Sequence, residues 1–486
     1  MGEKPLYYAQ PQNGLFLFAS EARAILASGL VERRLDPITL QVYLYNGFTV
    51  APRTILAGVS SLLPGHWMRV GLDGQIREIR RYWALPPFAA DPPSGQDERL
   101  EDLRQELAEA TAMRMISDVP LGAFLSGGLD SSVVVALMSR AAGNVRTFSI
   151  GFAEQAFDES PYARWVAERF ETQHNAILLG LHEFNAWLEN GLDAMDQPTY
   201  DGLNTYFVAR AARESGLTVA LSGLGGDELF GGYPYFNLAP KIARLATAGR
   251  RFPFVLKRAL QATGRLHGPF KVWHIFEDDI PPGMELLAAY QTSQALFPKT
   301  AQANLWSKSP KKGVWFGLPQ EFVDFLNSEG SNTDLLARLS RYVLRLFQGE
   351  RTLRDSDSMS MASSLEVRTV FTDHVFVEKI WRIAGKVRCQ GAPDKPFEAQ
   401  LARPVLGDDY PYRRKQGFVF PFQVWLKNSA MRARIHEVLT DQSVLERLGL
   451  QKGGVIRILK DTSLPWSRWW ALYVLARWAD KHQAAL

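Results

Sequence analysis

The chain has 486 residues, of which 46% are hydrophobic and 22% are charged. This composition is typical of a globular protein, and a prior of about 150 residues per domain predicts two or three folding units. The formal net charge is only +4, and lysine and arginine are spread along the chain. This pattern excludes the basic stripe that nucleic-acid binding requires, so we expect no nucleic-acid partner.

Cysteine usage and the apolar runs indicate the compartment. The single cysteine, Cys389, rules out an intramolecular disulfide and fits a reducing compartment. The first residues lack the charged start and apolar stretch of a signal peptide, and no apolar run approaches the ~18 residues of a membrane span. We therefore expect a soluble, cytoplasmic protein without a membrane partner.

Residues 6–82 carry short apolar runs that are separated by turn residues, which predicts mostly strands. Prolines in the stretch 86–97 disfavour both helix and strand, so this stretch is predicted to be a linker. The predicted organisation is therefore a mostly β region over 1–85, a linker over 86–97 and one large domain over 98–486.

Strand and helix patterns alternate after the linker. Apolar residues from Leu100 to Met113 recur at helical spacing, and Ser160-Pro161 is a typical helix start. The predicted strands are 121–125, 147–152 and 218–222, and a helix is predicted over 131–142. Such alternation predicts an α/β fold with a doubly wound parallel sheet, followed by a mainly helical part from about residue 238.

The first motif, Ser-Gly-Gly-Leu-Asp-Ser-Ser at 126–132, stands where a buried strand ends and a helix begins. The glycines let the backbone turn tightly and point N–H groups at phosphate, and the serine hydroxyls and the helix N-terminus favour the same anion. Asp130 would repel phosphate, unless it binds a Mg²⁺ ion that carries pyrophosphate. A glycine turn with serine caps is the alternative, but it explains neither Asp130 nor both glycines. The motif lacks the Walker A ending, which argues against γ-phosphate transfer.

The second motif follows the strand at 218–222 and runs from Gly223 to Tyr233, with Asp227 and Glu228 among its glycines. Taken alone, it could be a glycine-rich turn with a solvated pair of carboxylates. Because the carboxyl ends of parallel strands meet at one edge of a sheet, we expect the two loops and their carboxylates to converge there.

The first motif is similar to the loop of the ATP pyrophosphatase superfamily, whose members adenylate a substrate and release pyrophosphate. The second motif resembles the corresponding loop of glutamine-hydrolysing asparagine synthetases. The segments 359–368 and Lys415-Gln416-Gly417-Phe418 also resemble that family, in the same order. The resemblance implies an ATP pyrophosphatase fold that is preceded by the remnant of an N-terminal-nucleophile glutaminase domain.

The resemblance also implies roles for single residues, with ATP and Mg²⁺ as cofactors. Lys415, Asp227 and Glu228 would be catalytic, and Asp130 and Asp227 would bind Mg²⁺. Glu366 and Arg368 would bind polar groups of the substrate, although a structural ion pair explains them equally well. The implied ATP-binding residues are Leu125, Ser126, Gly127, Gly128, Asp130, Ser131, Ser132, Ile150, Ser222 and Gly223.

Two departures from the family affect the acid substrate and the nitrogen donor. Family members begin with a cysteine that attacks glutamine, whereas this chain begins at a point that resembles the inside of that domain. We therefore expect no glutaminase activity from the chain as given. The expected nitrogen donor is ammonia, either from solution or from a separate glutaminase partner. A homodimer is also a possible assembly. Leu224 stands where the family has an acidic residue associated with acyl-AMP formation, which puts aspartate in doubt.

The leading functional hypothesis is an amide-forming ligase. It converts aspartate, ATP and ammonia into asparagine, AMP and pyrophosphate through an acyl-AMP intermediate. A related amidotransferase or lactam-forming ligase that acts on another carboxylate, in polysaccharide or secondary-metabolite biosynthesis, is the first alternative. A decayed ATP-binding paralogue without activity is the second, and the presence of Asp130, Asp227 and Lys415 argues against it.

Overall fold

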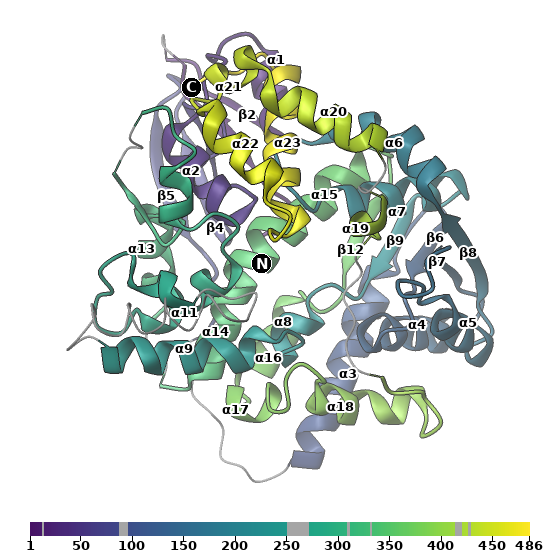
Figure 1. The fold of residues 1–486 in the computed structure, drawn as a ribbon. Helices are drawn as coiled ribbons and strands as arrows, with labels where there is room; N and C mark the ends of the chain where they lie inside the picture. The colour runs from purple at the N-terminus through teal and green to yellow at the C-terminus, as the bar shows by residue number, and fades with distance from the viewer. Residues whose placement is uncertain are drawn as a thin grey trace.

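The computed structural model describes residues 1–11, 14–86, 96–249, 272–308, 312–330, 333–413, 420–425 and 429–486. Figure 1 shows a sheet with helices on both sides, and a larger helical part that reaches the amino-terminal region. The purple amino-terminal region lies beside the yellow carboxyl-terminal helices, whereas the marked N-terminus lies nearer the middle of the molecule (Figure 1).

The amino-terminal region combines short antiparallel strands with two helices. Its strands are β1 (Tyr7–Ala9), β2 (Leu17–Ala19), β3 (Val59–Ser61), β4 (His66–Val70) and β5 (Ile76–Arg81), and its helices are α1 (Ala22–Ala27) and α2 (Pro37–Asn46). The strands form a sheet of order β2-β1-β3 and a β4-β5 pair. The predicted strands are therefore present, but the two helices were not predicted. In α2 every residue from Thr39 to Asn46 is buried, so its sequence shows no one-sided apolar period.

A five-stranded parallel sheet forms the centre of the second part, as predicted. Its strands are β6 (Leu121–Phe124), β7 (Arg146–Phe152), β8 (Gln173–Leu179), β9 (Val219–Ser222) and β12 (Glu366–Thr369). The order is β12-β9-β6-β7-β8, so the chain moves outward from β6 in one direction and returns to β9 on the other side. This reversal creates a switch point between β6 and β9, which is where open parallel sheets bind ligands.

Helices cover both faces of this sheet, which is the arrangement that a doubly wound fold requires. The helices around it are α3 (Gln96–Arg114), α4 (Leu129–Ala142), α5 (Ser160–Arg169), α6 (Leu181–Ala194), α7 (Leu203–Glu214) and α15 (Arg354–Met361). Ala123 and Leu221 pack with residues of α3 and α4, whereas Ala220 packs with Ala209 and Ala212 of α7 on the other face. The helices predicted at α3, α4 and α5 are present, although Met113 of α3 is exposed.

The rest of the described chain is mainly helical, as predicted. Its elements are α8 (Gly226–Phe230), α9 (Tyr235–Gly249), a 3-10 helix (Val272–Phe276), α11 (Glu285–Gln294), α12 (Lys299–Ala303), β10 (Val314–Trp315), β11 (Leu318–Pro319), α13 (Gln320–Ser328), α14 (Leu335–Tyr342), a π-helix (Val343–Leu353), α16 (His374–Trp381), α17 (Gly385–Arg388), α18 (Pro396–Leu406), α19 (Phe422–Trp425), α20 (Ser429–Thr440), α21 (Gln442–Arg447), α22 (Lys452–Lys460) and α23 (Trp466–Lys481). The helix α18 and the loop before it pack beside α4 and carry residues to the sheet edge.

The amino-terminal region and the carboxyl-terminal helices share one hydrophobic core. The Leu35 N–H donates to the carbonyl of Ala485 at 2.7 Å, and the Tyr43 hydroxyl donates to the carbonyl of Ala471 at 2.8 Å. Of the predicted linker, residues 87–95 lie outside the described residues, and α3 already begins at Gln96. The predicted domain boundaries therefore stay a prediction.

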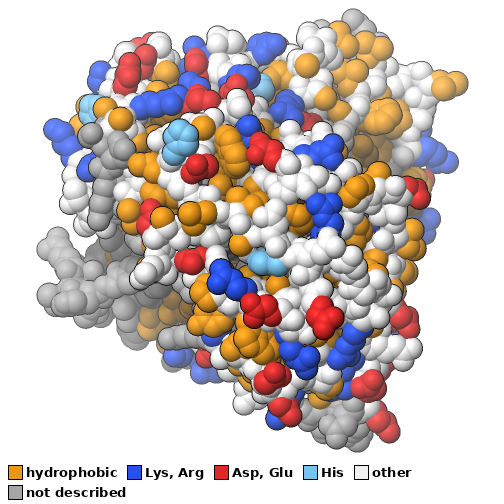
Figure 2. Space-filling model, turned by 90° about the vertical axis from the view of Figure 1, so that its right-hand side faces the viewer, with side chains coloured by type: hydrophobic (Ala, Val, Ile, Leu, Met, Phe, Trp, Pro, Cys, Tyr) orange, Lys and Arg blue, Asp and Glu red, His pale blue; other side chains and the backbone are white. Residues whose placement is uncertain are grey.

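Two surface features bear on the expected partners. On the face shown in Figure 2, basic and acidic side chains are interspersed and form no basic stripe. Among the helices in the described ranges, none is long and apolar enough to cross a membrane.

Candidate active site

A cavity of about 790 Å³ opens at the carboxyl ends of β6 and β9. This volume lies in the usual range for small-molecule sites, and the position is the switch point of the sheet. The predicted ATP-binding residues that line it are Leu125, Ser126, Gly128, Asp130, Ser131, Ile150, Ser222 and Gly223. Both glycine-rich loops therefore border one cavity, as the sequence predicts.

The first loop is held in a tight turn by Gly127 and its serines. Gly127 has a φ angle of 72°, and a Cβ atom there would lie 2.5 Å from the backbone of Tyr162 and Ala163, so only glycine fits. The Gly128 N–H donates to Ser126 Oγ at 3.2 Å, and Ser126 Oγ lies 3.1 Å from Ser131 Oγ. The loop thus presents hydroxyl groups beside the N-terminus of α4, which favours an anion.

The other predicted serine, Ser132, braces this turn from inside α4. Its hydroxyl donates to the carbonyl of Gly128 at 2.8 Å. Tyr410, which the sequence patterns did not single out, donates its hydroxyl to the carbonyl of Gly127 at 3.0 Å. Burial raises the pKa of Tyr410 to about 12, so this phenol stays a donor at neutral pH. Gly127 and Ser132 therefore shape the loop without lining the cavity.

The second loop touches the first through Gly226. A Cβ atom on Gly226 would collide with Oδ1 of Asp130, so the close approach of the two loops requires glycine at this position. Asp227 follows directly in α8, and it too lines the cavity. Two carboxylates from strand ends that are far apart in the sequence thus face each other.

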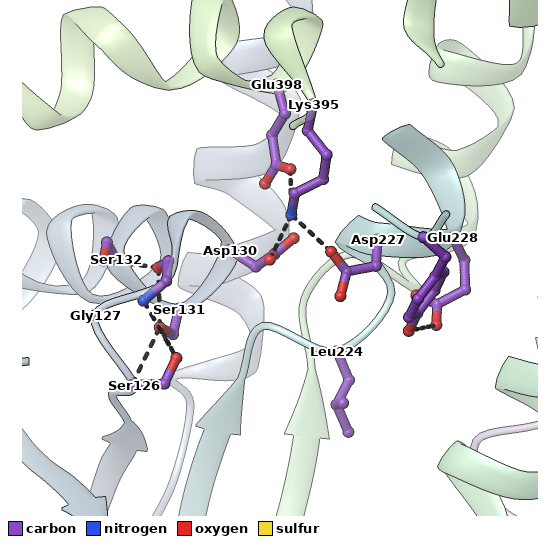
Figure 3. Close-up of polar contacts among 12 residues, drawn as sticks. Ser126, Gly127, Asp130, Ser131, Ser132, Leu224, Asp227, Glu228, Lys395 and Glu398 are labelled. Atoms are coloured by element: carbon purple, nitrogen blue, oxygen red, sulfur yellow. Dashed lines mark hydrogen bonds and ion pairs between the residues drawn. The ribbon is translucent and has the colours of Figure 1, made fainter. Parts of the chain in front are cut away.

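One buried ammonium group joins these carboxylates (Figure 3). Lys395 Nζ lies 2.6 Å from Asp130 Oδ2, 2.9 Å from Asp227 Oδ1 and 2.8 Å from Glu398 Oε2. The Lys395 side chain is only 3% exposed. Burial alone would lower the pKa of Lys395, but the three carboxylates raise it well above its ordinary value. Lys395 is therefore charged and offsets part of the negative charge at this point.

The backbone at Lys395 adopts an unusual conformation. Lys395 precedes the first turn of α18 with φ 50° and ψ 54°, which is a left-handed conformation. This conformation costs free energy for any residue other than glycine. Pro396 then starts the helix, and Glu398 lies one turn further on. The pattern Lys-Pro-x-Glu could have indicated a helix start, but no local sequence pattern indicates that Lys395 pairs with Asp130.

The carboxylates fit the Mg²⁺ ion that the sequence implies. Oδ1 of Asp130 is buried and has no hydrogen-bond partner among the described residues. Asp130 and Asp227 already converge on one cation at hydrogen-bond distance, and carboxylate oxygens are ligands that Mg²⁺ prefers.

The charge balance of the cavity also favours a bound divalent cation. Its described lining carries the carboxylates of Asp130, Glu159, Asp227, Glu228 and Asp394, against the positive charges of Lys395 and Arg413. A triphosphate would be repelled by this excess of carboxylates, unless it enters with a divalent cation.

Glu228 lines the cavity beside Asp227. It accepts a hydrogen bond of 2.9 Å from the Tyr233 hydroxyl. Burial, and secondly the charge of Asp227, raises the pKa of Glu228 to about 7. Glu228 therefore adds a carboxyl group to the cavity wall.

Leu224 marks the other end of the cavity. Its side chain points away from Lys395 and from the two carboxylates (Figure 3). The lining of the same cavity also includes Asn204, Thr205 and Val208 of α7, and Ser356 of α15. We call these four residues together with Leu224 the acyl end, and the part around 126–132, Asp227 and Lys395 the phosphate end.

Residues 102–480 match the asparagine synthase family, and residues 1–83 match a glutamine amidotransferase domain. The chain belongs to the asparagine synthase family. It is 27% identical to glutamine-hydrolyzing asparagine synthetase 1 of Bacillus subtilis over 468 residues, which are 95% of this chain and 70% of that protein. A Methanocaldococcus jannaschii relative is 38% identical over 241 residues, 48% of this chain and 45% of its own length. Amidase chyE of Penicillium rubens is 22% identical over 484 residues, covering 92% and 70%.

Three residues that resemblance to the asparagine synthase family implied do not lie in the described cavity wall. Lys415 lies outside the described residues. Glu366 and Arg368 are not among the residues that line the cavity. Arg368 Nε donates to Glu366 Oε1 at 2.9 Å, and its Nη1 donates to the carbonyls of Arg114 and Ile116. This geometry is that of the alternative, a structural ion pair.

Proposed function

We propose that the chain is an ATP-dependent amide-forming ligase that activates a carboxylate as an acyl-adenylate and releases pyrophosphate. The observation that carries the proposal is the convergence of two glycine-rich loops, with Asp130 and Asp227, on one buried cation at the switch point of a parallel sheet. Membership of the asparagine synthase family supports it.

In this proposal, different residues bind different parts of the nucleotide. The adenine lies between Leu125 and Ile150, near Ser222 and Gly223, and the phosphates lie against the loop 126–132. Mg²⁺ held by Asp130 and Asp227 would offset the charge of pyrophosphate. Lys395 already sits at these carboxylates and offers its ammonium to the same phosphates, a role that the sequence did not indicate.

The reaction has two steps. An oxygen of the acid forms a bond to the α-phosphorus of ATP, and the bond from that phosphorus to the bridging oxygen breaks, which releases pyrophosphate. Ammonia then attacks the acyl carbon and loses a proton, and AMP leaves with the electrons of the broken carbon–oxygen bond. Lys415 and Lys395 stabilise the negative charge on pyrophosphate and on the tetrahedral oxyanion.

Two acids are candidates. Aspartate, with asparagine as the product, follows from the asparagine synthetase name of relatives such as the Bacillus subtilis protein. Another carboxylate is favoured by Leu224, because an apolar side chain lines the cavity at the end away from the carboxylates.

The nitrogen donor is ammonia from solution or from a separate glutaminase. Hydrolysis of glutamine by a cysteine needs an accessible thiolate, and Cys389 is the only cysteine of the sequence. Cys389 is buried, and burial raises its pKa to about 11. We propose that this chain does not hydrolyse glutamine by itself.

A product assay tests the proposal. We expect AMP and pyrophosphate to form only when MgATP, a carboxylic acid and ammonium are all present. Asp130→Asn should lower this rate about 100-fold or more, because it weakens the metal and phosphate site. The matched control is Asp73→Asn, whose carboxylate is exposed and pairs with Arg77, and its rate should not change. ADP as the product would contradict the mechanism. MgATP binding without turnover on any acid would favour the inactive paralogue.

A further inference from the structure

The acyl end carries neutral groups. Val208 and Leu224 are apolar, and Asn204, Thr205 and Ser356 contribute an amide and two hydroxyl groups. Asn204 Nδ2 donates to Asp201 Oδ1 at 2.7 Å, which fixes the orientation of the amide. Oδ1 of Asn204 is buried and has no hydrogen-bond partner among the described residues.

The positive charges in the described lining of the cavity lie at the phosphate end. Lys395 is held there by Asp130, Asp227 and Glu398. Arg413 pairs with Glu159, and its guanidinium lies 4.3 Å from the ring centre of Tyr162, a residue that borders Gly127.

The mostly buried Arg351 lies near the acyl end, but its guanidinium pairs with other residues of the protein. Arg351 Nη1 donates to the Tyr200 hydroxyl at 2.8 Å, and Nη2 lies 3.4 Å from Asp201 Oδ2. Its guanidinium also stacks at 3.8 Å over the ring of Phe347. Arg351 does not line the cavity. It therefore supplies no counter-ion to a substrate bound beside Leu224.

A second carboxylate on the substrate would meet an unfavourable site at the acyl end. Burying a carboxylate without a cation is costly, and the Glu228 carboxyl borders the same space. A neutral body instead suits the site, because it can pack against the apolar side chain of Leu224 without burying a second charge.

We propose that the acyl end selects a carboxylic acid whose only negative group is the carboxylate that becomes activated. This inference rests on the proposed ligase function and names its substrate class. L-aspartate falls outside the class, because its α-carboxylate is a second negative group that would lie at the acyl end. Neutral hydroxylated acids and amides of dicarboxylic acids fall within it.

Two matched pairs of acids test the inference with the full chain, MgATP and ammonium. The first pair is L-aspartate and L-isoasparagine, which differ only in whether the α-carboxylate is free or an amide. The second pair is the dicarboxylate galactarate and the monocarboxylate galacturonate. The measurement is the kcat/KM of AMP formation for each acid.

We expect the member with one carboxylate to be used about tenfold better, or more, in at least one pair, and the dicarboxylate to be preferred in neither. Equal or better use of the dicarboxylates would overturn the inference while leaving the ligase function intact. AMP formation with none of the four acids, although MgATP binds, would count against the proposed function and would overturn the inference with it.

A charge placed at the acyl end sharpens the test. Leu224→Arg should raise the kcat/KM for L-aspartate relative to L-isoasparagine about tenfold, because it supplies the missing cation. The matched control is Leu178→Arg, which adds the same charge at a leucine that is 66% exposed, and it should leave the ratio unchanged. An unchanged ratio in folded Leu224→Arg protein would contradict the inference. If that variant does not fold, the comparison of acids with the unaltered chain decides.

Discussion

The two ends of the cavity are built on different physical principles. At the phosphate end, the buried Lys395 binds the carboxylates of Asp130 and Asp227. At the acyl end, Leu224 and its neighbours on α7 present no charge to the substrate. The phosphate end is therefore held by paired ions, whereas the side chains that define the acyl end are neutral. If the proposed function is correct, we expect the acid specificity to vary without disturbing the binding of ATP.

The largest expected effect breaks the ion pairing at the phosphate end. Lys395→Met leaves the buried carboxylates of Asp130, Asp227 and Glu398 without their cation. We expect the free energy of unfolding in urea to fall by about 3–5 kcal/mol. Added Mg²⁺ should restore stability more strongly in this variant than in the unaltered protein, because the carboxylates regain a cation.

The control for this variant is a lysine whose ion pair is exposed. Lys481 Nζ lies 2.6 Å from Asp193 Oδ2, and the two side chains are 48% and 43% exposed. Lys481→Met should cost no more than about 1 kcal/mol. Equal losses in Lys395→Met and Lys481→Met would show that the charge at Lys395 is no more important than a surface charge.

An intermediate effect concerns the carboxyl group behind the acyl end. Asp355 accepts a hydrogen bond from Thr199 Oγ1 at 2.7 Å, and burial raises its pKa from 3.8 to about 6. Because the folded protein holds this proton more tightly than the unfolded chain, stability is full below pH 3.8 and is lost as the pH rises to about 6.

Asp355→Asn removes this titration and keeps an oxygen acceptor for Thr199. Relative to the variant, the unaltered protein should lose about 2–3 kcal/mol between the two pH limits. The measurement is urea unfolding of both proteins from pH 4 to pH 7. A difference that does not change with pH would show that folding does not raise the pKa of Asp355.

The smallest expected effect alters the spacing of the two loops. In Gly226→Ala the new Cβ must displace the carboxylate of Asp130, at a cost of about 1–3 kcal/mol. The affinity for MgATP, measured by calorimetry, should fall as well. Gly453→Ala in α22 is the control, because its Cβ would meet Arg457 Nη1 at an ordinary 3.9 Å. Unchanged stability and affinity in Gly226→Ala would mean that the loops do not touch there.

Much of the fold could be predicted from local patterns. The strands β6, β7 and β9 and the helix from Leu129 to Ala142 are signalled by apolar runs and by the glycine motif after β6, whereas the edge strands β8 and β12 were not predicted. Helix α2 could not be recognised in this way. It is buried on nearly all sides, so its residues follow neither a helical nor a strand period.

The sequence alone determined the two glycine-rich loops and their chemistry, because tight turns, hydroxyl groups and carboxylates beside a strand end are local properties. Only the tertiary structure decided that Lys395, 265 positions from Asp130, joins the carboxylates. It also decided that Asn204 and Ser356 line the same cavity as Leu224. The reason is that the order of strands in the sheet and the packing of α7, α15 and α18 around it depend on the whole chain, and no local pattern encodes which distant residues share one cavity.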